Sequence, residues 1–252
     1  MVKDNSLLAS QVIRIRFYSL DNTNLNCHYL VVNDPIYAKL AVYSIASFLF
    51  HNRNFKVVIH SDAKCFRALL WRSRIFFGSK CKVLRVQNSS EDPMYQKALL
   101  LLQLQGTKDI FVDADTRFNG VLKGQDSITV LVREFRLEEQ ATWLHVCKLL
   151  EVDSTKSFML NTSFLTWSGV NLNVTNDLFH DFYQKYLSLP WSDISNLFLT
   201  QERSLTRLVE QFFFSILLSS QDVNFLKEHD KVADKGVIES TYFGASGYRF
   251  GR

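Results

Sequence analysis

Two carboxylates separated by one small residue follow an apolar segment in FVDADTRF, residues 111–118. Positions i and i+2 of an extended chain lie on the same side, so Asp113 and Asp115 can face one point. Two hard oxygen donors suit Mg²⁺ or Mn²⁺, with diphosphate oxygens and water completing the coordination shell. The alternative is a pair of aspartates that caps a turn or the next helix. The motif lies at the end of a buried strand, where open α/β sheets bind ligands. With this position included, a metal site and a capping pair are equally supported.

A second candidate for chemistry is the strand-to-helix turn in VVNDPIYAKLAVYSIASFLF, residues 31–50. The apolar run ends at Asn33 and Asp34, Pro35 follows, and Tyr37 lies in the first turn of the expected helix. Free N–H groups at a helix start and a flat aromatic ring together suit a nucleotide. Taken alone, an ordinary turn with Asp34 as the helix N-cap is the favoured interpretation.

Three further polar residues stand in apolar surroundings. Lys97 lies sixteen positions before Asp113 and can reach a phosphate as a compact charge, although most such lysines are simply solvated. Glu210 and Gln211 interrupt a helix expected over 204–218 that is otherwise apolar on all sides. Because a buried carboxylate is unfavourable unless it is paired or functional, Glu210 is either a site residue or the partner of a neighbour such as Arg207.

The elements that must position these residues differ between the two halves of the chain. The first half alternates short apolar strands with helices, which predicts βαβ units and a parallel sheet buried on both faces. The expected strands are 27–32, 55–60, 80–86 and 108–113, and the expected helices are 38–51, 61–76 (capped by Ser61 or Asp62) and 93–105. The second half is mixed α+β, with strands over 128–132 and 158–167 and helices over 137–151, 177–187 and 204–218.

Composition excludes several classes of protein. The 252 residues show no repeat and no Gly/Ser/Pro linker, which predicts one domain. With 47% hydrophobic and 21% charged residues, the chain is neither disordered nor of low complexity. A net charge of +4 suits a phosphate-bearing ligand or peripheral contact with an anionic membrane, but it is too small and dispersed to indicate nucleic acid.

The expected location is cytoplasmic. The four cysteines form no CxxC pair, which favours a reducing compartment over a zinc or redox motif. The N-terminus has no long apolar signal region, and the most apolar late run, 212–218, is far shorter than the roughly 20 residues of a membrane span.

Two of these segments together resemble a known family. NDPIYAK followed by a helix and FKVVIHSD is similar to the opening of the glycogenin-like nucleotide-sugar transferases. YQKALLLLQLQGTKDIFVDADT is similar to the stretch in which that family has a lysine, a helix and a strand ending in D-A-D-T. The family is glycosyltransferase family 8, of the GT-A fold, and the resemblance covers roughly residues 27–120. It implies a single GT-A domain over 1–252, with a nucleotide-sugar-binding half (27–120) and an acceptor- and sugar-binding half (121–252).

The resemblance also implies roles for individual residues. Asn33 and Tyr37 would contact uridine, Lys97 the diphosphate, and Asp113 with Asp115 the Mn²⁺ (or Mg²⁺). The family's Asn-Ser-Gly element corresponds here to Asn161, Thr162 and Ser163, and its Asp-Gln pair near the reacting sugar carbon corresponds to Glu210 and Gln211.

The chain departs from the family in its last segment. The family's late His-x-x-Gly-x-x-Lys supplies a third metal ligand, but TYFGASGYRFGR has Thr241 and Gly247 at the histidine and lysine positions. His229 can replace the histidine as a metal ligand, and Arg249 or Arg252 can replace the lysine on the diphosphate.

The combined expectation is a metal-dependent, retaining glycosyltransferase that moves a sugar from a UDP-sugar to a saccharide or glycoconjugate acceptor. Glu210 would act near the anomeric carbon, with Gln211 and Asn161 on sugar hydroxyls. One alternative is an inverting GT-A enzyme in which Glu210 or Glu202 is the general base. Another is a degenerate relative that binds a nucleotide or glycan without turnover. A sugar-nucleotide pyrophosphorylase is disfavoured, because VVNDPIYAK contains no glycine for a phosphate loop.

Overall fold

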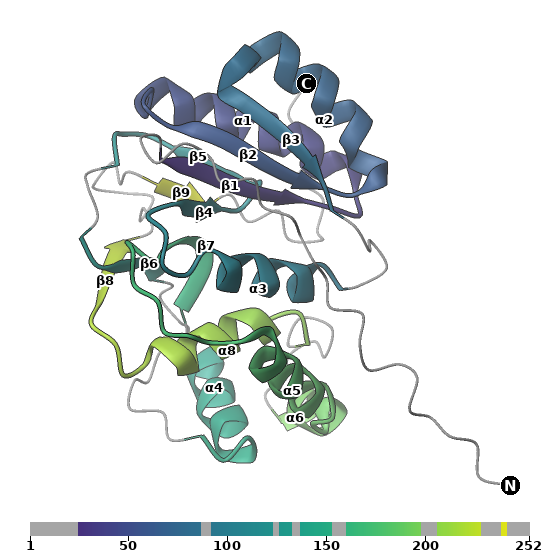
Figure 1. The fold of residues 1–252 in the computed structure, drawn as a ribbon. Helices are drawn as coiled ribbons and strands as arrows, with labels where there is room; N and C mark the ends of the chain where they lie inside the picture. Colours follow the sequence, from purple (N-terminus) through teal and green to yellow (C-terminus); the bar gives the residue numbers. More distant parts are fainter. Residues whose placement is uncertain are drawn as a thin grey trace, which may run out of the picture.

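The computed structural model describes residues 25–86, 92–122, 126–132, 137–152, 160–197, 206–227 and 238–240. The first half alternates strand and helix as the sequence predicts (Figure 1). Its elements are β1 (Asn26–Val31), α1 (Pro35–His51), β2 (Lys56–Ser61), α2 (Ala63–Phe77), the 3₁₀ turn η1 (Gly78–Lys80), β3 (Cys81–Arg85), α3 (Pro93–Gln103) and β4 (Ile110–Val112).

The second half contains the expected strands and helices together with elements that the sequence did not predict. Its elements are β5 (Thr116–Phe118), β6 (Ile128–Val132), α4 (Leu137–Leu149), β7 (Leu160–Thr166), α5 (Asn176–Leu187), α6 (Trp191–Leu197), α8 (Val209–Leu218), β8 (Val223–Lys227) and β9 (Ile238–Ser240). Helix α5 ends before Pro190, as expected, but α6 begins directly after that proline. Proline is well tolerated at a helix start, where its missing N–H would have no partner.

Seven of the described strands form one mostly parallel sheet in the order β3-β2-β1-β4-β7-β6-β8. Strands β1, β2, β3 and β4 pair in parallel, β7 is antiparallel to β4 and β6, and β6 pairs with β8 in parallel. The carboxyl end of β4 therefore lies beside the amino-terminal part of β7. Asp113 and the Asn161–Ser163 segment, far apart in sequence, are brought to the same edge of the sheet.

Helices cover both faces of the sheet (Figure 1). Helices α1 and α2 pack on one face of β1, β2 and β4, where the buried core includes Tyr29, Ile45 and Phe48. Helices α3, α5 and α8 pack on the other face, around Phe111 of β4 and Trp167. A third apolar cluster joins α4, α5, α6 and α8. The mixed α/β fold class expected from the sequence is confirmed.

Aspartates cap the helices that follow β1, β2 and β3. Asp34 Oδ1 accepts from the N–H of Ile36 at 2.9 Å, so Asp34 caps α1, as the ordinary-turn interpretation predicts. Asp62, rather than Ser61, caps α2 by accepting from the N–H of Cys65 at 2.8 Å. Asp92 caps α3 through the N–H of Met94. Each cap satisfies an N–H group that the helix itself leaves unpaired.

Helix α8 corrects the expected helix over 204–218, because it begins at Val209. Residues 206–208 form a short turn before it, and 201–205 lie outside the described residues. Leu205 and Leu208 continue the helical spacing of apolar residues before and within this turn, so the sequence pattern alone extends the helix too far. The consequence is that Glu210 lies in the first turn of α8, where the helix dipole favours a negative charge.

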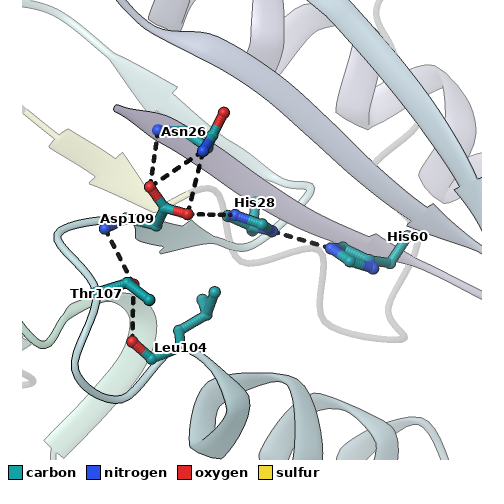
Figure 2. Close-up of polar contacts among 6 residues, drawn as sticks. All are labelled: Asn26, His28, His60, Leu104, Thr107 and Asp109. Carbon is teal, nitrogen blue, oxygen red and sulfur yellow. Dashed lines mark hydrogen bonds and ion pairs between the residues drawn. The ribbon is translucent and has the colours of Figure 1, made fainter. Parts of the chain in front are cut away.

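A buried polar network lies on the sheet face opposite α1 and α2 (Figure 2). His28 Nε2 is 3.1 Å from Asp109 Oδ2, and His28 Nδ1 is 2.9 Å from His60 Nε2. Asn26 donates to Asp109 from its backbone N–H at 3.0 Å and from its side-chain amide at 3.2 Å. Burial would raise the pKa of Asp109, but the hydrogen bonds from His28 and Asn26 outweigh it and lower that pKa.

This network predicts a loss of stability in mild acid. Burial, and secondly the neighbouring His28, hold the pKa of His60 well below its usual value near 6.5. The unfolded state therefore takes up a proton before the folded state does as the pH falls below ~6.5, and stability decreases by at most about 1.4 kcal/mol per pH unit. Urea unfolding at about pH 7.5 and about pH 5.5 should show a smaller loss in His60→Gln than in the wild type. The matched control, His51→Gln at the end of α1, should keep the wild-type pH dependence; equal losses in all three proteins would contradict the assignment.

Two further expectations concern the cysteines and the membrane. All four cysteines are free thiols, and burial raises the pKa of Cys65 to about 12. No helix in the described part of the chain combines the length and apolar character that a membrane span requires.

Candidate active site

A buried lysine contacts the first aspartate of the D-x-D motif. Lys97, on α3, is 5% exposed, and its Nζ is 2.9 Å from Asp113 Oδ1 and 3.0 Å from Oδ2. Asp113 directly follows β4, and its N–H donates to Ser163 O of β7 at 2.8 Å. The pairing of β4 with β7 thus fixes the backbone of Asp113, while α3 brings a cation to its side chain.

The same lysine contacts the glutamate at the start of α8. Lys97 Nζ is 3.0 Å from Glu210 Oε1, which also accepts from Thr162 Oγ1 at 2.8 Å. The other oxygen, Oε2, accepts from the N–H of Gln211 at 2.7 Å. Glu210 is fully buried. Its cationic partner is therefore Lys97, not the neighbouring Arg207 that the sequence offered.

Two carboxylates hold the charge of Lys97. Burial would lower the pKa of Lys97, but Asp113 and Glu210 outweigh it and raise the pKa, so the ammonium stays charged. Arg207 adds a second positive charge to this region, since it acts on Tyr37 together with Asp113 and Asp115.

Tyr37 lies at the exposed side of the cluster. It is 40% exposed in the first turn of α1. Burial raises its pKa first, and the charges of Asp115, Asp34 and Asp113 raise it further, whereas Arg207 opposes them. These interactions place Tyr37 within electrostatic range of both aspartates of the D-x-D motif and of Arg207.

Asn33, between β1 and α1, has a constrained backbone. Its φ of 71° lies in the left-handed region, which asparagine tolerates better than most residues. Its N–H donates to Asp62 Oδ2 at 2.7 Å, while the other oxygen of the fully buried Asp62 caps α2. Asp62 therefore ties the ends of β1 and β2 together and leaves the side chain of Asn33 exposed.

The remaining predicted residues are placed in different ways. Asn161 is 3% exposed, and its Oδ1 accepts from the N–H of Ser163 at 2.9 Å. Gln211 Oε1 is buried and has no hydrogen-bond partner among the described residues. His229, Arg249 and Arg252 lie outside the described residues.

The D-x-D turn carries two carboxylates that suit a divalent cation. Asp113 and Asp115 offer partly buried carboxylate oxygens, the ligand type that Mn²⁺ and Mg²⁺ prefer. Within the described ranges, no group of three or more His, Cys, Asp or Glu side chains is placed to hold a metal ion. The two carboxylates fit a cation whose other ligands come from a diphosphate and water, as is common for Mg²⁺.

A late strand brings another part of the chain to this turn. β5 begins at Thr116, directly after Asp115, and Thr116 pairs with Ser240 of β9. The segment that was compared with the family's late motif follows Ser240 in the sequence, and Thr241 and Gly247 lie outside the described residues.

Sequence reasoning did not assign site roles to two residues that the structure adds. Thr162 was noted only as part of a motif, yet its hydroxyl holds Glu210. Every residue of β7 is buried, so no polar–apolar alternation could indicate which side chain faces the glutamate. Arg207 was considered only as a structural partner of Glu210. Its position three residues before Glu210 was the only feature of the sequence that pointed to it.

The order and direction of the strands define the class of fold to which the protein belongs. The mostly parallel sheet, with the D-x-D turn at the carboxyl end of β4, is the GT-A glycosyltransferase fold. A structure of galactosyltransferase LgtC in complex with donor and acceptor sugar analogues has a TM-score of 0.54, with 9% identity over 88% of each chain.

Two other solved structures carry glycosyltransferase names. The bifunctional glycosyltransferase WbbM has a TM-score of 0.48 and 11% identity over 83% of this chain and 40% of its own. GlyE of Streptococcus pneumoniae TIGR4 has a TM-score of 0.42 and 11% identity over 81% of this chain and 45% of its own. Because these two superpose less closely, the fold rests on the galactosyltransferase. No protein-family model matches the sequence, and neither does any curated protein.

Proposed function

We propose that the protein is a member of glycosyltransferase family 8 that transfers a sugar from a UDP-sugar to a saccharide or glycoconjugate, with retention of anomeric configuration. The proposal treats residues 1–252 as one GT-A domain, with a donor half over 27–120 and an acceptor half over 121–252. The observation that carries it is the contact of Lys97 with both Asp113 and Glu210. One buried cation joins the residue proposed to bind the metal and the residue proposed to act at the sugar.

The donor would lie across the carboxyl ends of β1 and β4. Tyr37, exposed at the start of α1, would stack on the uracil, and Asn33 would contact the same nucleoside from the turn that Asp62 fixes. Asp113 and Asp115 would hold Mn²⁺ or Mg²⁺, with His229 as the proposed third ligand. The metal would supply Lewis-acid stabilisation of the departing diphosphate.

The residues of the chain would act on the sugar and the leaving group. Lys97 would hold Asp113 and Glu210 in place and add positive charge near the diphosphate, where charge develops during transfer. Glu210, oriented by Thr162 and the N–H of Gln211, would stabilise or attack the anomeric carbon. Gln211 Oε1, a buried acceptor with no partner among the described residues, would accept from a sugar hydroxyl, and Asn161 would bind another.

A donor screen by thermal shift tests this proposal. A ligand at a hundredfold excess over its Kd stabilises the folded state by about 2.7 kcal/mol, which raises the Tm of a chain of this size by several degrees. We expect that shift with a UDP-sugar and Mn²⁺, a smaller one without the metal, and a loss of metal dependence in Asp113→Asn. Asp193→Asn, an exposed carboxylate on α6, is the matched control and should respond like the wild type.

The alternatives give different results in the same assay. A donor shift without release of UDP to water or to an acceptor would identify a binding protein without turnover. A donor shift with transfer and an inverted product anomer would identify an inverting enzyme. No shift with UDP-, GDP- or CMP-linked sugars would contradict the proposal.

A further inference from the structure

The positive charge is not dispersed along the chain, as the composition suggested, but concentrated in one segment. Residues 35–86, from the start of α1 past the end of β3, contain ten of the 29 lysines and arginines and one of the 25 acidic residues. That single acid, Asp62, is fully buried as the cap of α2. The rest of the chain is therefore net acidic, while the surface of this segment presents cations without any carboxylate.

Helix α2 places these cations on one face together with large apolar side chains. Its buried residues Cys65, Leu69 and Ser73 face the sheet at a spacing of four. The opposite face, at i, i+3, i+7, i+10 and i+11, consists of exposed residues: Lys64, Arg67, Trp71, Arg74 and Ile75. Trp71 is 70% and Ile75 71% exposed, and Phe76, the next residue along the chain, is 64% exposed.

Helix α1 continues this surface. It lies beside α2 over the same sheet face (Figure 1). Its exposed stripe consists of Ile36, Lys39, Tyr43 and Phe50, and the helix contains no acidic residue. This stripe of α1 and the exposed face of α2 are together called the α1–α2 surface.

A hollow at the first turn of α2 adjoins the α1–α2 surface. It has a volume of about 260 Å³ and is lined by Ala63, Phe66, Arg67 and Arg85. Two guanidinium groups at one hollow suit a phosphate, because arginine presents several N–H donors to its oxygens.

We propose that the α1–α2 surface docks on an anionic lipid bilayer. Exposed tryptophan, tyrosine and aliphatic side chains among lysines and arginines are the composition of helices that lie in a membrane interface. The cations attract the anionic leaflet, Trp71 and Ile75 enter the boundary between headgroups and acyl chains, and a lipid phosphate occupies the hollow between Arg67 and Arg85. The proposal does not depend on the proposed transferase activity.

The charge of the surface opposes self-association as the explanation for these exposed residues. A symmetric dimer through the α1–α2 surface would place the same cationic patch on both sides of the interface. Like charges brought together repel each other, whereas a bilayer with anionic lipids supplies the opposite charge.

The tryptophans provide a direct probe of docking. The chain has four, and the other three, Trp143, Trp167 and Trp191, are at most 4% exposed. With vesicles of phosphatidylcholine and about a quarter phosphatidylglycerol, emission should shift to the blue as Trp71 leaves water. The shift should be absent with phosphatidylcholine alone and should weaken at high salt, because the Debye length falls from about 10 Å at 0.1 M to about 3 Å at 1 M.

Vesicle co-sedimentation with variants completes the test. Arg67→Gln and Arg74→Gln should each lower the partition coefficient about fivefold, and Trp71→Ser about tenfold. All three residues are exposed, so the variants should keep the wild-type Tm. Lys148→Gln on α4 and Leu197→Ser on α6, both exposed and distant in sequence from the surface, are the charge and apolar controls and should bind like the wild type.

Several outcomes would overturn the proposal. These are equal binding to zwitterionic vesicles, equal losses in the control variants, and no emission shift with anionic vesicles. A dimer in solution that dissociates in Trp71→Ser, without vesicle binding, would instead identify a second copy of the chain as the occupant. Binding of an oligonucleotide that competes for the same residues in the absence of vesicle binding would identify nucleic acid.

Discussion

Lys97→Met should lower the free energy of unfolding by about 3 to 5 kcal/mol, because removing one partner of a buried ion pair leaves the other charges uncompensated. Asp113 and Glu210 both lose their cation, and Glu210 is fully buried. Methionine has a similar length and no charge, so the loss reflects electrostatics more than a cavity. Urea unfolding at neutral pH measures it.

The pH dependence distinguishes this electrostatic effect from a packing defect. In the wild type, Asp113 and Glu210 raise the pKa of Lys97, so the unfolded state releases that proton first as the pH rises above about 10.4. The stabilisation from the charge of Lys97 is then lost progressively, and the deficit of Lys97→Met should shrink between about pH 8 and about pH 11. Lys148→Met on α4 is the control, since Lys148 is exposed. A deficit that is independent of pH would show that the charge of Lys97 is not what stabilises the site.

A double variant tests whether Lys97 and Glu210 stabilise the fold through their mutual contact. In Lys97→Met with Glu210→Gln, one of the two uncompensated carboxylates becomes neutral, while Thr162 can still donate to the amide oxygen. The double variant should then be more stable than Lys97→Met alone, which is the non-additivity expected of residues in contact. Strict additivity would show that Lys97 and Glu210 act independently.

The elements of the first half of the chain could be predicted because their signals are local. Each strand from β1 to β3 is a short β-rich run followed by a helix, and the carboxylates Asp34, Asp62 and Asp92 mark the helix starts. The parallel pairing follows from this alternation, since parallel strands need a crossover between them.

The second half could be predicted only in part, because its structure depends on distant pairs. β5 pairs with β9 over more than a hundred residues, and neither three-residue strand has a pattern of its own. β7 is buried along its whole length, so its sequence identifies an apolar strand but not its antiparallel position between β4 and β6.

The candidate site also combines residues that are close in sequence with contacts between distant segments. Asp113, Asp115 and Lys97 lie within one strand–helix unit, and their spacing is visible in the sequence. The contact of Lys97 with Glu210, and of Glu210 with Thr162, joins α3, α8 and β7, and it exists only because those elements pack on the same face of the sheet. The apolar surroundings of Glu210 indicated that it needs a partner; they did not indicate which one.

Glu210→Gln should reduce sugar transfer by about 10²- to 10³-fold, the loss typical of removing one preorganised electrostatic group from an active site. The amide keeps the size of the side chain, and its oxygen can still accept from Thr162 or from the N–H of Gln211. What is lost is the negative charge that the proposed function places near the anomeric carbon, where positive charge would develop during transfer. Release of UDP from the donor identified in the thermal-shift screen measures the effect.

The division between kcat and KM separates this role from a structural one. Tyr37 and the D-x-D turn, not Glu210, are proposed to bind the nucleotide, so Glu210→Gln should lower kcat and leave the donor KM and the metal-dependent thermal shift close to those of the wild type. A structural role predicts the reverse, because an altered ion pair with Lys97 would move Asp113 and weaken donor binding. Asp193→Asn should retain both constants, since that carboxylate is exposed on α6. Equal kcat values in Glu210→Gln and the wild type would remove Glu210 from the chemistry and leave it as the buried partner of Lys97.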